Sequence, residues 1–190
     1  LFEKALTLNP NNQDLYIHLD DLYKQQDLSD KRAGLLEAMR GLDPIREDLR
    51  KRILAIMVDL GQYKQALVIL TSEKFVPLEM DQSFHWLYVK ALIQSAESQL
   101  KAGRIEGAIA EYQKALDFPE NQGVGRPTTM ANAEILYLLG NAYELLGKYH
   151  QAVKAWQEAA SEHHTFGDVL FPYVQKSLDK LGRYSELGFV

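Results

Sequence analysis

Residues 135–160 read ILYLLGNAYELLGKYHQAVKAWQEAA and contain two helical patterns that meet at Gly147. Glycine takes the left-handed conformation that caps a helix without a steric penalty, so the first helix is expected to end there. Tyr149 packs into the corner, and Ala152 allows the second helix to approach the first closely. Trp156 then fills the gap one turn further on. The stretch therefore predicts a pair of antiparallel helices.

The same arrangement recurs at three other glycines. They lie in LGQYKQALVIL, AGRIEGAIAEYQKAL and LGRYSELG, and are Gly61, Gly103 and Gly182. The second helices are expected to end at or before prolines, which disfavour a helical conformation in the residue that precedes them; these are Pro44, Pro77 and Pro119. One helical unit that recurs along a chain is typical of repeat proteins, in which neighbouring units stack.

These residues resemble the tetratricopeptide repeat (TPR) family. Within 135–160, the residues that match its signature are Leu136, Leu139, Gly140, Tyr143, Ala152, Trp156 and Ala159. An earlier stretch matches in part, with Asp20 in place of the small residue; the matching residues are Tyr16, Leu19 and Tyr23. The resemblance covers nearly the whole chain. It implies an all-α fold, a right-handed superhelical solenoid of antiparallel helix pairs.

We expect a single solenoid domain over residues 1–190. Residues 1–12 would hold the second helix of a truncated repeat, repeats would occupy 13–44, 45–80, 81–120 and 130–164, and 165–190 would be an incomplete last repeat. Helices are expected over 1–8, 13–25, 29–41, 46–60, 63–72, 82–102, 105–117, 130–146, 149–162 and 166–181, and residues 184–190 would begin another. Because the chain starts inside a helical pattern, we interpret it as a fragment of a larger protein. Truncated repeats expose apolar faces, which predicts weak self-association through Leu1, Phe2, Phe189 and Val190.

Composition restricts the function classes. The net charge of -5 at pH 7 disfavours a nucleic-acid surface, because phosphates require a clustered positive field. The absence of cysteine excludes a disulfide framework and thiolate sites, and suits a cytoplasmic protein. No apolar run approaches the roughly 18 residues that cross a bilayer, so no membrane partner is expected.

No residues form a recognisable catalytic, cofactor-binding or metal-binding pattern. The histidines lack the one-turn spacing of a helical zinc site and are expected at surfaces or helix ends; they are His18, His85, His150, His163 and His164. Without an assembled acid, base or nucleophile, the chain is predicted not to be an enzyme itself. The aromatic run at 84–88 is interpreted as packing between repeats, with an exposed binding patch as the alternative.

Residues 118–129, FPENQGVGRPTT, are expected to form an insertion loop. Its glycines do not indicate a phosphate-binding loop, because no strand precedes them and no lysine followed by serine or threonine comes after them. Thr128 or Thr129 is expected to cap the next helix. Arg126 is a candidate partner contact, and the loop is predicted to be a connector that docks on a neighbouring domain.

The repeat pattern, placed on a superhelix, predicts a concave face of mixed charge. The residues expected there are Asp14, Ile17, Asp21, Lys24, Asp48, Lys51, Asp59, Lys90, Glu97, Lys101, Glu134, Tyr137, Asn141 and Glu144. Candidate partner-binding residues from this face and the loop are Lys51, Lys90, Glu97, Lys101, Glu134, Tyr137, Asn141 and Arg126. TPR proteins that grip acidic chaperone tails carry a lysine four residues before an asparagine. Tyr137 stands there before Asn141, so this carboxylate clamp is absent.

The order of KFVPLEMDQ, AGRIEGAIAEYQKAL, DFPENQGVGRP and AEILYLLGNAYELLG is similar to the helical C-terminal part of bacterial multidomain proteins with an N-terminal, uncharacterised galactose-mutarotase-like β-sandwich. Residues 119–125 match the Pro-Glu-Asn-x-Gly-x-Gly connector of those proteins, whereas Leu78-Glu79-Met80 departs from their Trp-Glu-Gly. Two functions remain open. One is a protein-interaction or scaffold module that binds a peptide, a subunit or a neighbouring domain, and the other is an auxiliary helical domain of a carbohydrate-active enzyme.

Overall fold

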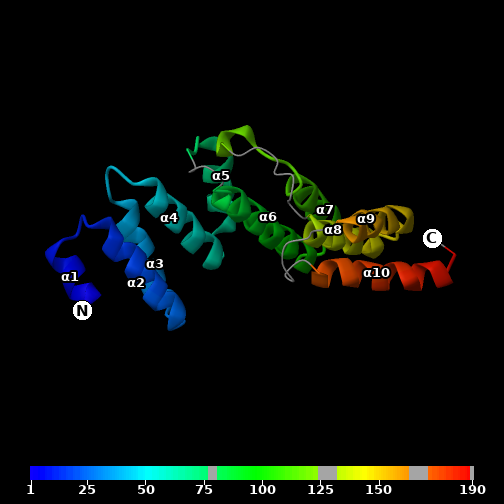
Figure 1. Ribbon diagram of the computed structural model, residues 1–190, viewed down its shortest axis with the longest axis horizontal. Coiled ribbons are helices and arrows are strands. Elements are labelled where there is room, and N and C mark those ends of the chain that lie inside the picture. The colour runs from blue at the N-terminus through cyan, green and yellow to red at the C-terminus, as the bar shows by residue number, and fades with distance from the viewer. Residues whose placement is uncertain (77–80, 124–131, 163–170, 189–190) are drawn as a thin grey trace. The chain divides into compact units, whose positions relative to one another are not determined.

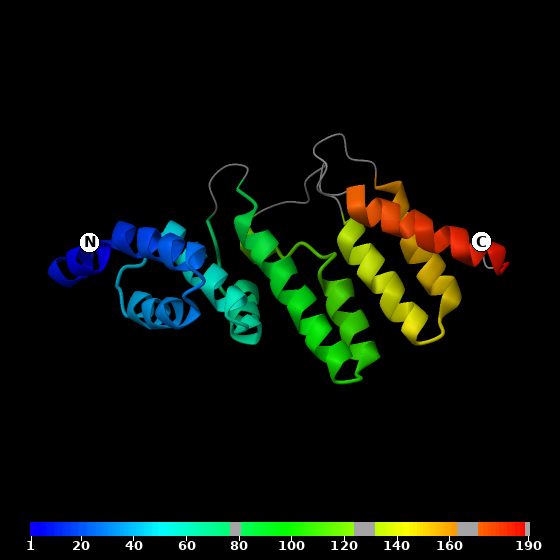
Figure 2. The same ribbon diagram turned by 90° about the horizontal axis from the view of Figure 1, so that it is seen from below.

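The computed structural model describes residues 1–76, 81–123, 132–162 and 171–188. These residues form ten α-helices and one short 3-10 helix, and none of them lies in a β-strand (Figure 1). Consecutive helices pair across short turns, as Figure 2 shows for α8 (Ala133–Leu145) and α9 (Tyr149–Ser161). The predicted all-α fold of antiparallel helix pairs is confirmed.

The chain divides into two compact units, with the division inside α6 (Ser83–Lys101). Unit 1 comprises Leu1–Ala91 and Pro119–Val124. Its other elements are α1 (Phe2–Leu8), α2 (Gln13–Gln25), α3 (Ser29–Arg40), α4 (Glu47–Asp59), α5 (Tyr63–Ser72) and η1 (Glu120–Gln122). Unit 2 comprises Leu92–Phe118 and Gly125–Val190, and its other elements are α7 (Ile105–Lys114), α8, α9 and α10 (Phe171–Glu186).

Left-handed glycines follow the first helix of three pairs, as predicted. Gly61, Gly103 and Gly147 have φ values of 78°, 73° and 68°, which would cost a residue with a side chain about 1–2 kcal/mol. After Gly147, the Lys148 N–H donates to the carbonyl of Tyr143 at 3.0 Å and closes the end of α8. Most helix ends lie close to the expected positions. α7 stops three residues early, where its last turn loosens into a hydrogen-bonded turn at residues 114–117, and α10 continues five residues beyond its expected end at 181.

The turn predicted at Gly182 is wrong. Gly182 lies inside α10, which continues to Glu186, and the left-handed glycine that follows this helix is Gly188, with φ of 78°. The predicted second helix from residue 184 is therefore wrong as well. A glycine inside a helix costs about 1 kcal/mol. Packing of Tyr184 against Trp156, with ring centroids 5.1 Å apart, outweighs that cost.

A small residue faces a large one in the core of unit 2. The Trp156 ring is fully buried beside Gly140. A methyl group at position 140 would lie 2.6 Å from Cδ1 and 2.9 Å from Cε2 of that ring. Both distances are too short for van der Waals contact, so the indole can occupy this place only because residue 140 has no side chain.

Unit 1 replaces this small-residue contact with a buried ion pair. Asp20 and Arg32 occupy the places that Gly140 and Ala152 hold in unit 2, twelve residues apart in each case. Asp20 is fully buried, and the Nε of Arg32 donates to its Oδ1 at 2.7 Å. Arg52 donates to the other oxygen of Asp20 at 3.1 Å. Asp20, which departs from the small residue of the repeat pattern, is thus paired with Arg32, and a buried carboxylate requires such a partner.

Candidate functional site

The predicted binding residues of unit 1 are occupied by ion pairs. The Nζ of Lys51 lies 2.8 Å from Oδ2 of Asp81, and the Nζ of Lys90 lies 2.6 Å from Oδ1 of Asp59. Asp59 also accepts from Lys24 at 3.0 Å and from Arg32 at 3.1 Å. Both cations are therefore already engaged in ion pairs within the same unit, Lys51 with Asp81 and Lys90 with an Asp59 that Lys24 and Arg32 share.

Electrostatics keeps both of these carboxylates charged at neutral pH. Hydrogen bonds, first from Lys51 and then from Ser83, lower the pKa of Asp81 to about 2. Burial acts to raise the pKa of Asp59, but hydrogen bonds from Lys90 and Lys24 outweigh it, and the pKa falls to about 2. Both carboxylates therefore stay ionised across the physiological pH range.

The predicted residues of α8 lie along one side of that helix in unit 2. Glu134, Tyr137 and Asn141 follow each other at helical spacing of three and four residues, and all three are half-buried. α10 packs against both α8 and α9, and Figures 1 and 2 show it alongside them. Residues from α8 and α10 therefore share one surface, which we call the α8–α10 surface: Glu134, Tyr137, Asn141, Tyr173 and Lys176.

Tyr173 connects α10 to α8. Its hydroxyl donates to Oε1 of Glu134 at 2.5 Å, and its ring lies 5.8 Å from the ring of Tyr137, measured between centroids. The hydrogen bond to Glu134, followed by burial, raises the pKa of Tyr173 to about 12. The phenol therefore stays protonated and serves as a donor, and the two rings form an aromatic platform.

The ammonium of Lys176 lies over this platform. Its Nζ is 4.7 Å from the centroid of the Tyr173 ring and 5.9 Å from that of Tyr137. Both distances fall within the range of about 6 Å over which a cation is attracted to an aromatic face. Lys176 itself is an exposed residue.

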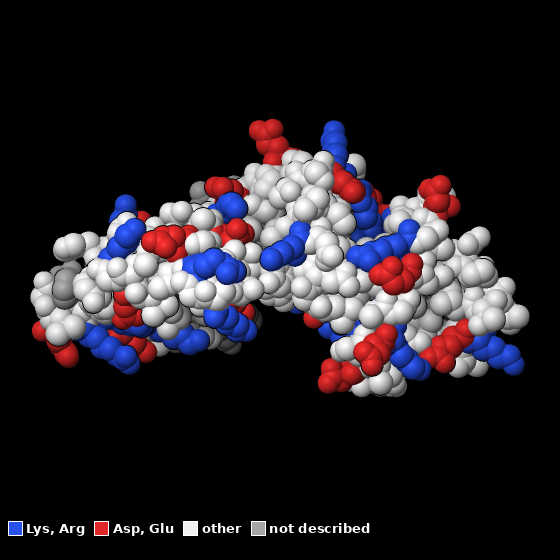
Figure 3. Space-filling model, turned by 180° about the vertical axis from the view of Figure 1, so that it is seen from behind, with Lys and Arg blue, Asp and Glu red and all other residues white. Residues whose placement is uncertain are grey.

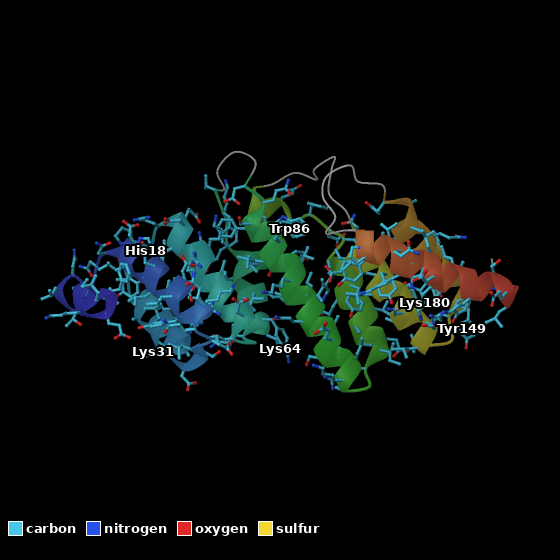
Figure 4. All side chains as sticks on the ribbon, turned by 60° about the horizontal axis from the view of Figure 1, so that its bottom comes forward. His18, Lys31, Lys64, Trp86, Tyr149 and Lys180 are labelled. Carbon is cyan, nitrogen blue, oxygen red and sulfur yellow. The ribbon has the colours of Figure 1, made fainter. Side chains whose placement is uncertain are left out.

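The far end of the α8 row is closed by other residues of α10. Glu144 accepts hydrogen bonds from Lys180 and from the Tyr184 hydroxyl, the latter at 2.8 Å. Lys180 also lies over the Trp156 ring, 4.9 Å from its centroid. In Figure 4, Lys180 is labelled on α10, near the labelled Tyr149 of α9. Glu144, which was expected on the binding face, is thus used to hold α10 in place.

The other predicted residues of unit 2 lie on the C-terminal half of α6. Glu97 and Lys101 are both exposed there. Burial, and then the charges of Glu97 and Glu134, raise the pKa of the buried Tyr112 to about 12. Glu97 also contributes to the raised pKa of Tyr173, so its charge acts on the same region as the α8–α10 surface. Arg126 lies outside the described residues, as do Thr128 and Thr129.

The described part of the insertion loop binds unit 1 of its own chain. The Asn121 side chain donates to the carbonyls of Leu70 and Glu73 at 2.9 and 2.6 Å, and the Phe75 N–H donates to the Asn121 carbonyl at 2.9 Å. These bonds satisfy carbonyl groups at the end of α5 that have no partner within the helix. We call residues 119–123 the clip.

The clip also explains why His85, which lies in the first turn of α6, is buried and not at the surface. Its side chain is 1% exposed, and its Nδ1 lies 3.2 Å from Oε1 of the buried Gln122. Burial, opposed by the Gln122 hydrogen bond, lowers the pKa of His85. In the same run Phe84 and Tyr88 are core residues, as expected, whereas Trp86 is 49% exposed (Figure 4).

Other features restrict what the described surface can do. On the face in Figure 3, lysine and arginine are interspersed with aspartate and glutamate. No group of three or more potential metal ligands occurs among the described residues. Within those same residues, no helix is both long enough and apolar enough to span a membrane. His18 and His150 are exposed, as predicted, and His163 and His164 lie outside the described residues.

Residues 133–164 match the tetratricopeptide repeat family. This match supports one TPR-type repeat, limited to that stretch. The matched stretch contains α8 and α9. Gly140 and Trp156, which belong to the residues on which the resemblance was based, pack against each other there. A TPR supports a role in protein interaction in general, because such repeats present surfaces that bind other chains. No significant match to a curated protein was found.

Two important residues of the α8–α10 surface, Tyr173 and Lys176, were missed in the sequence. The helix over 166–181 was predicted, but the direction of its faces depends on how α10 packs against α8. The spacing of three residues between Tyr173 and Lys176 was the available signal, since it places both on one side of a helix.

Proposed function

We propose that the chain is a protein-interaction module that binds a segment of a partner protein on the α8–α10 surface. Protein interaction in general is supported by the TPR at residues 133–164. The location is supported by the half-buried row of Glu134, Tyr137 and Asn141. In contrast, the candidate residues Lys51 and Lys90 are occupied by internal ion pairs.

The single observation that carries this proposal is the composition of the row on α8. A half-buried tyrosine beside polar groups offers a large contact area at a low cost in conformational entropy, and tyrosine is enriched among residues that dominate binding energies. The Oδ1 of Asn141 is shielded from solvent and accepts no hydrogen bond from the described part of the chain. The side-chain amide also carries two N–H donors at Nδ2, and these would serve a backbone carbonyl of a bound segment.

A selection from a random peptide library on the immobilised chain tests the proposal. Peptides retained by the chain are expected to bind at least about fivefold more weakly to Tyr137→Ala, as for a residue that contributes about 1 kcal/mol or more. Tyr149→Ala is the matched control, because it removes the same side chain from α9, and it should leave binding unchanged. Circular dichroism checks that both variants are folded.

Two outcomes would overturn the proposal. One is a selection that retains no peptide, and the other is a set of peptides whose affinities are the same for Tyr137→Ala and Tyr149→Ala. The auxiliary-domain hypothesis and the expectation that the chain is not an enzyme stay predictions. A β-rich domain encoded upstream of Leu1 would favour the former.

A further inference from the structure

Lys176 contacts aromatic rings in place of a carboxylate. Its Nζ lies over the Tyr173 and Tyr137 rings, and Lys176 forms no ion pair with any residue that the structure describes. Lys180, one turn further along α10, pairs with Glu144. The platform therefore binds an ammonium group by its ring faces, and the ammonium that it holds belongs to an exposed, flexible side chain.

Among the described residues, two carboxylates whose charges act on this part of unit 2 have no cationic partner. Glu97 and Glu134 form no ion pair within the described ranges of the chain, although Glu134 accepts the Tyr173 hydroxyl. Their charges act on the same buried phenol, Tyr112, so both belong to one region of unit 2. Two aromatic faces beside two unpaired carboxylates have the chemistry that attracts a cationic side chain.

We propose that the α8–α10 surface recognises a lysine or arginine side chain of the partner segment, and that Lys176 occupies the same place in the free protein. The inference rests on the proposed function above and specifies the chemistry of the partner. On binding, the partner's cation takes the position over the Tyr137 and Tyr173 rings, close to Glu134. Lys176 then moves into solvent, which its exposed position allows.

An acidic partner segment fits this surface less well. A carboxylate placed over the rings would meet the negative face of two aromatic systems and the charges of Glu97 and Glu134. Lys176 is the cation that contacts the platform, and Lys180 is already paired with Glu144. The polarity is thus opposite to that of a surface that grips acidic tails.

Because Lys176 occupies the position over the two rings in the free protein, it should compete with a cationic ligand for that position. A surface contact between an ammonium and an aromatic face favours the occupied state by a factor of about two to five. A site occupied to that extent binds an outside cation about three- to sixfold more weakly than an empty site. Removing the lysine side chain should therefore strengthen binding of a cationic ligand, which is an unusual result for a change within a binding surface.

Nuclear magnetic resonance titration of the ¹⁵N-labelled chain tests this directly. The probes are N-acetyl-lysine methylamide and N-acetyl-arginine methylamide, and the neutral match is N-acetyl-norleucine methylamide. The cationic probes should shift the signals of Tyr137, Tyr173 and Lys176, and norleucine should not. Lys176→Ala should bind the lysine probe about three- to sixfold more tightly. Lys154→Ala, which removes an exposed lysine of α9, is the control and should change nothing.

A second variant keeps the test independent of Lys176. Glu97→Gln removes a charge without removing a hydrogen bond in the described structure, and it should weaken binding of the lysine probe by up to about fivefold. Circular dichroism verifies that each variant folds. Equal shifts with the norleucine probe, or the same affinity in Lys176→Ala as in Lys154→Ala, would overturn the inference.

The probe titration and the peptide selection distinguish a failure of this inference from a failure of the proposed function. Selected peptides that bind through Tyr137 but contain no lysine or arginine would leave the proposed function standing and overturn this inference. If the lysine probe binds as expected while the selection retains no peptide, the cation site stands and the proposed function fails.

Discussion

Replacing Gly140 with alanine should destabilise unit 2, although alanine is the better helix former. The added methyl group would lie 2.6 and 2.9 Å from two ring carbons of Trp156. The indole is fully buried, and Lys180 and Tyr184 contact it from α10. A rigid ring held on several sides cannot move away by a simple rotation, so α8 and α9 must separate slightly.

The size of the effect follows from two opposed contributions. Overpacking of a core costs about 1–3 kcal/mol, and a clash with a rigid ring belongs near the upper end of that range. Alanine in place of glycine inside a helix recovers about 1 kcal/mol. We therefore expect Gly140→Ala to lower the unfolding free energy by about 1–2 kcal/mol.

Gly182→Ala is the matched control in the same unit. Gly182 lies inside α10, and a methyl group there would have no atom within 4 Å. This variant has the same gain in helix propensity and no clash, so it should stabilise unit 2 by up to about 1 kcal/mol. Gly140→Ala is therefore expected to lower the unfolding free energy, and Gly182→Ala is expected to raise it.

A compensating change tests the mechanism. Trp156→Phe shortens the ring that meets the new methyl group, so the double variant should be more stable than the sum of the two single effects by about 1 kcal/mol or more. At the same spacing of sixteen residues in α6 and α7, the sequence has alanine with a six-membered ring, Ala96 and Tyr112, and both are buried.

Urea unfolding followed by circular dichroism measures these free energies, and amide hydrogen exchange shows whether the loss lies in α8 and α9. Gly140→Ala with stability equal to or above that of the unchanged chain would refute the reasoning. Strictly additive single and double variants would show that the cost does not arise from contact with Trp156.

Three further predictions concern unit 1. Asp20→Ala should lower the unfolding free energy by about 3–5 kcal/mol, since it leaves Arg32 buried without its main partner, whereas Asp20→Ala/Arg32→Ala should cost clearly less; equal losses in urea would contradict this. Because burial lowers the pKa of His85, the unfolded chain binds a proton more readily, and stability should fall as pH drops below about 6.5. A denaturation series from about pH 5 to 7 should show this slope, and a slope unchanged in His85→Gln would count against it. Asn121→Ala should cost about 1–3 kcal/mol and speed amide exchange at the end of α5, because the Glu73 carbonyl loses the Asn121 donor and the Leu70 carbonyl keeps only the longer bond from Gln122 at 3.5 Å. Asn11→Ala, on an exposed turn, should have no effect, and similar losses in both variants would argue against a role for the clip.

The helix-pair repeat could be predicted because its determinants are local. Gly147 ends a helix through its own backbone conformation, and Ala152 and Trp156 meet the first helix because of fixed helical spacing. The match at residues 133–164 confirms the TPR there. The α8 members of the candidate site could be named for the same reason, since position within a repeat determines which side of the helix a residue faces.

The clip could not be predicted, since it depends on contacts between residues far apart in the sequence. His85 is buried because Gln122, 37 residues later, returns to unit 1 and pairs with it. Nothing in the residues around His85 indicates that partner.

The sequence alone determined the all-α class, the helix pairs and the row of Glu134, Tyr137 and Asn141, because helix periodicity and glycine conformation act over a few residues. Only the tertiary structure decided that Gly182 stays helical, that Lys51 and Lys90 form ion pairs within unit 1, and that Lys176 lies over Tyr173. Each of these depends on a contact between elements. The physical reason is that these contacts join residues of different elements, whereas helix propensity and glycine conformation act only over a few neighbouring residues.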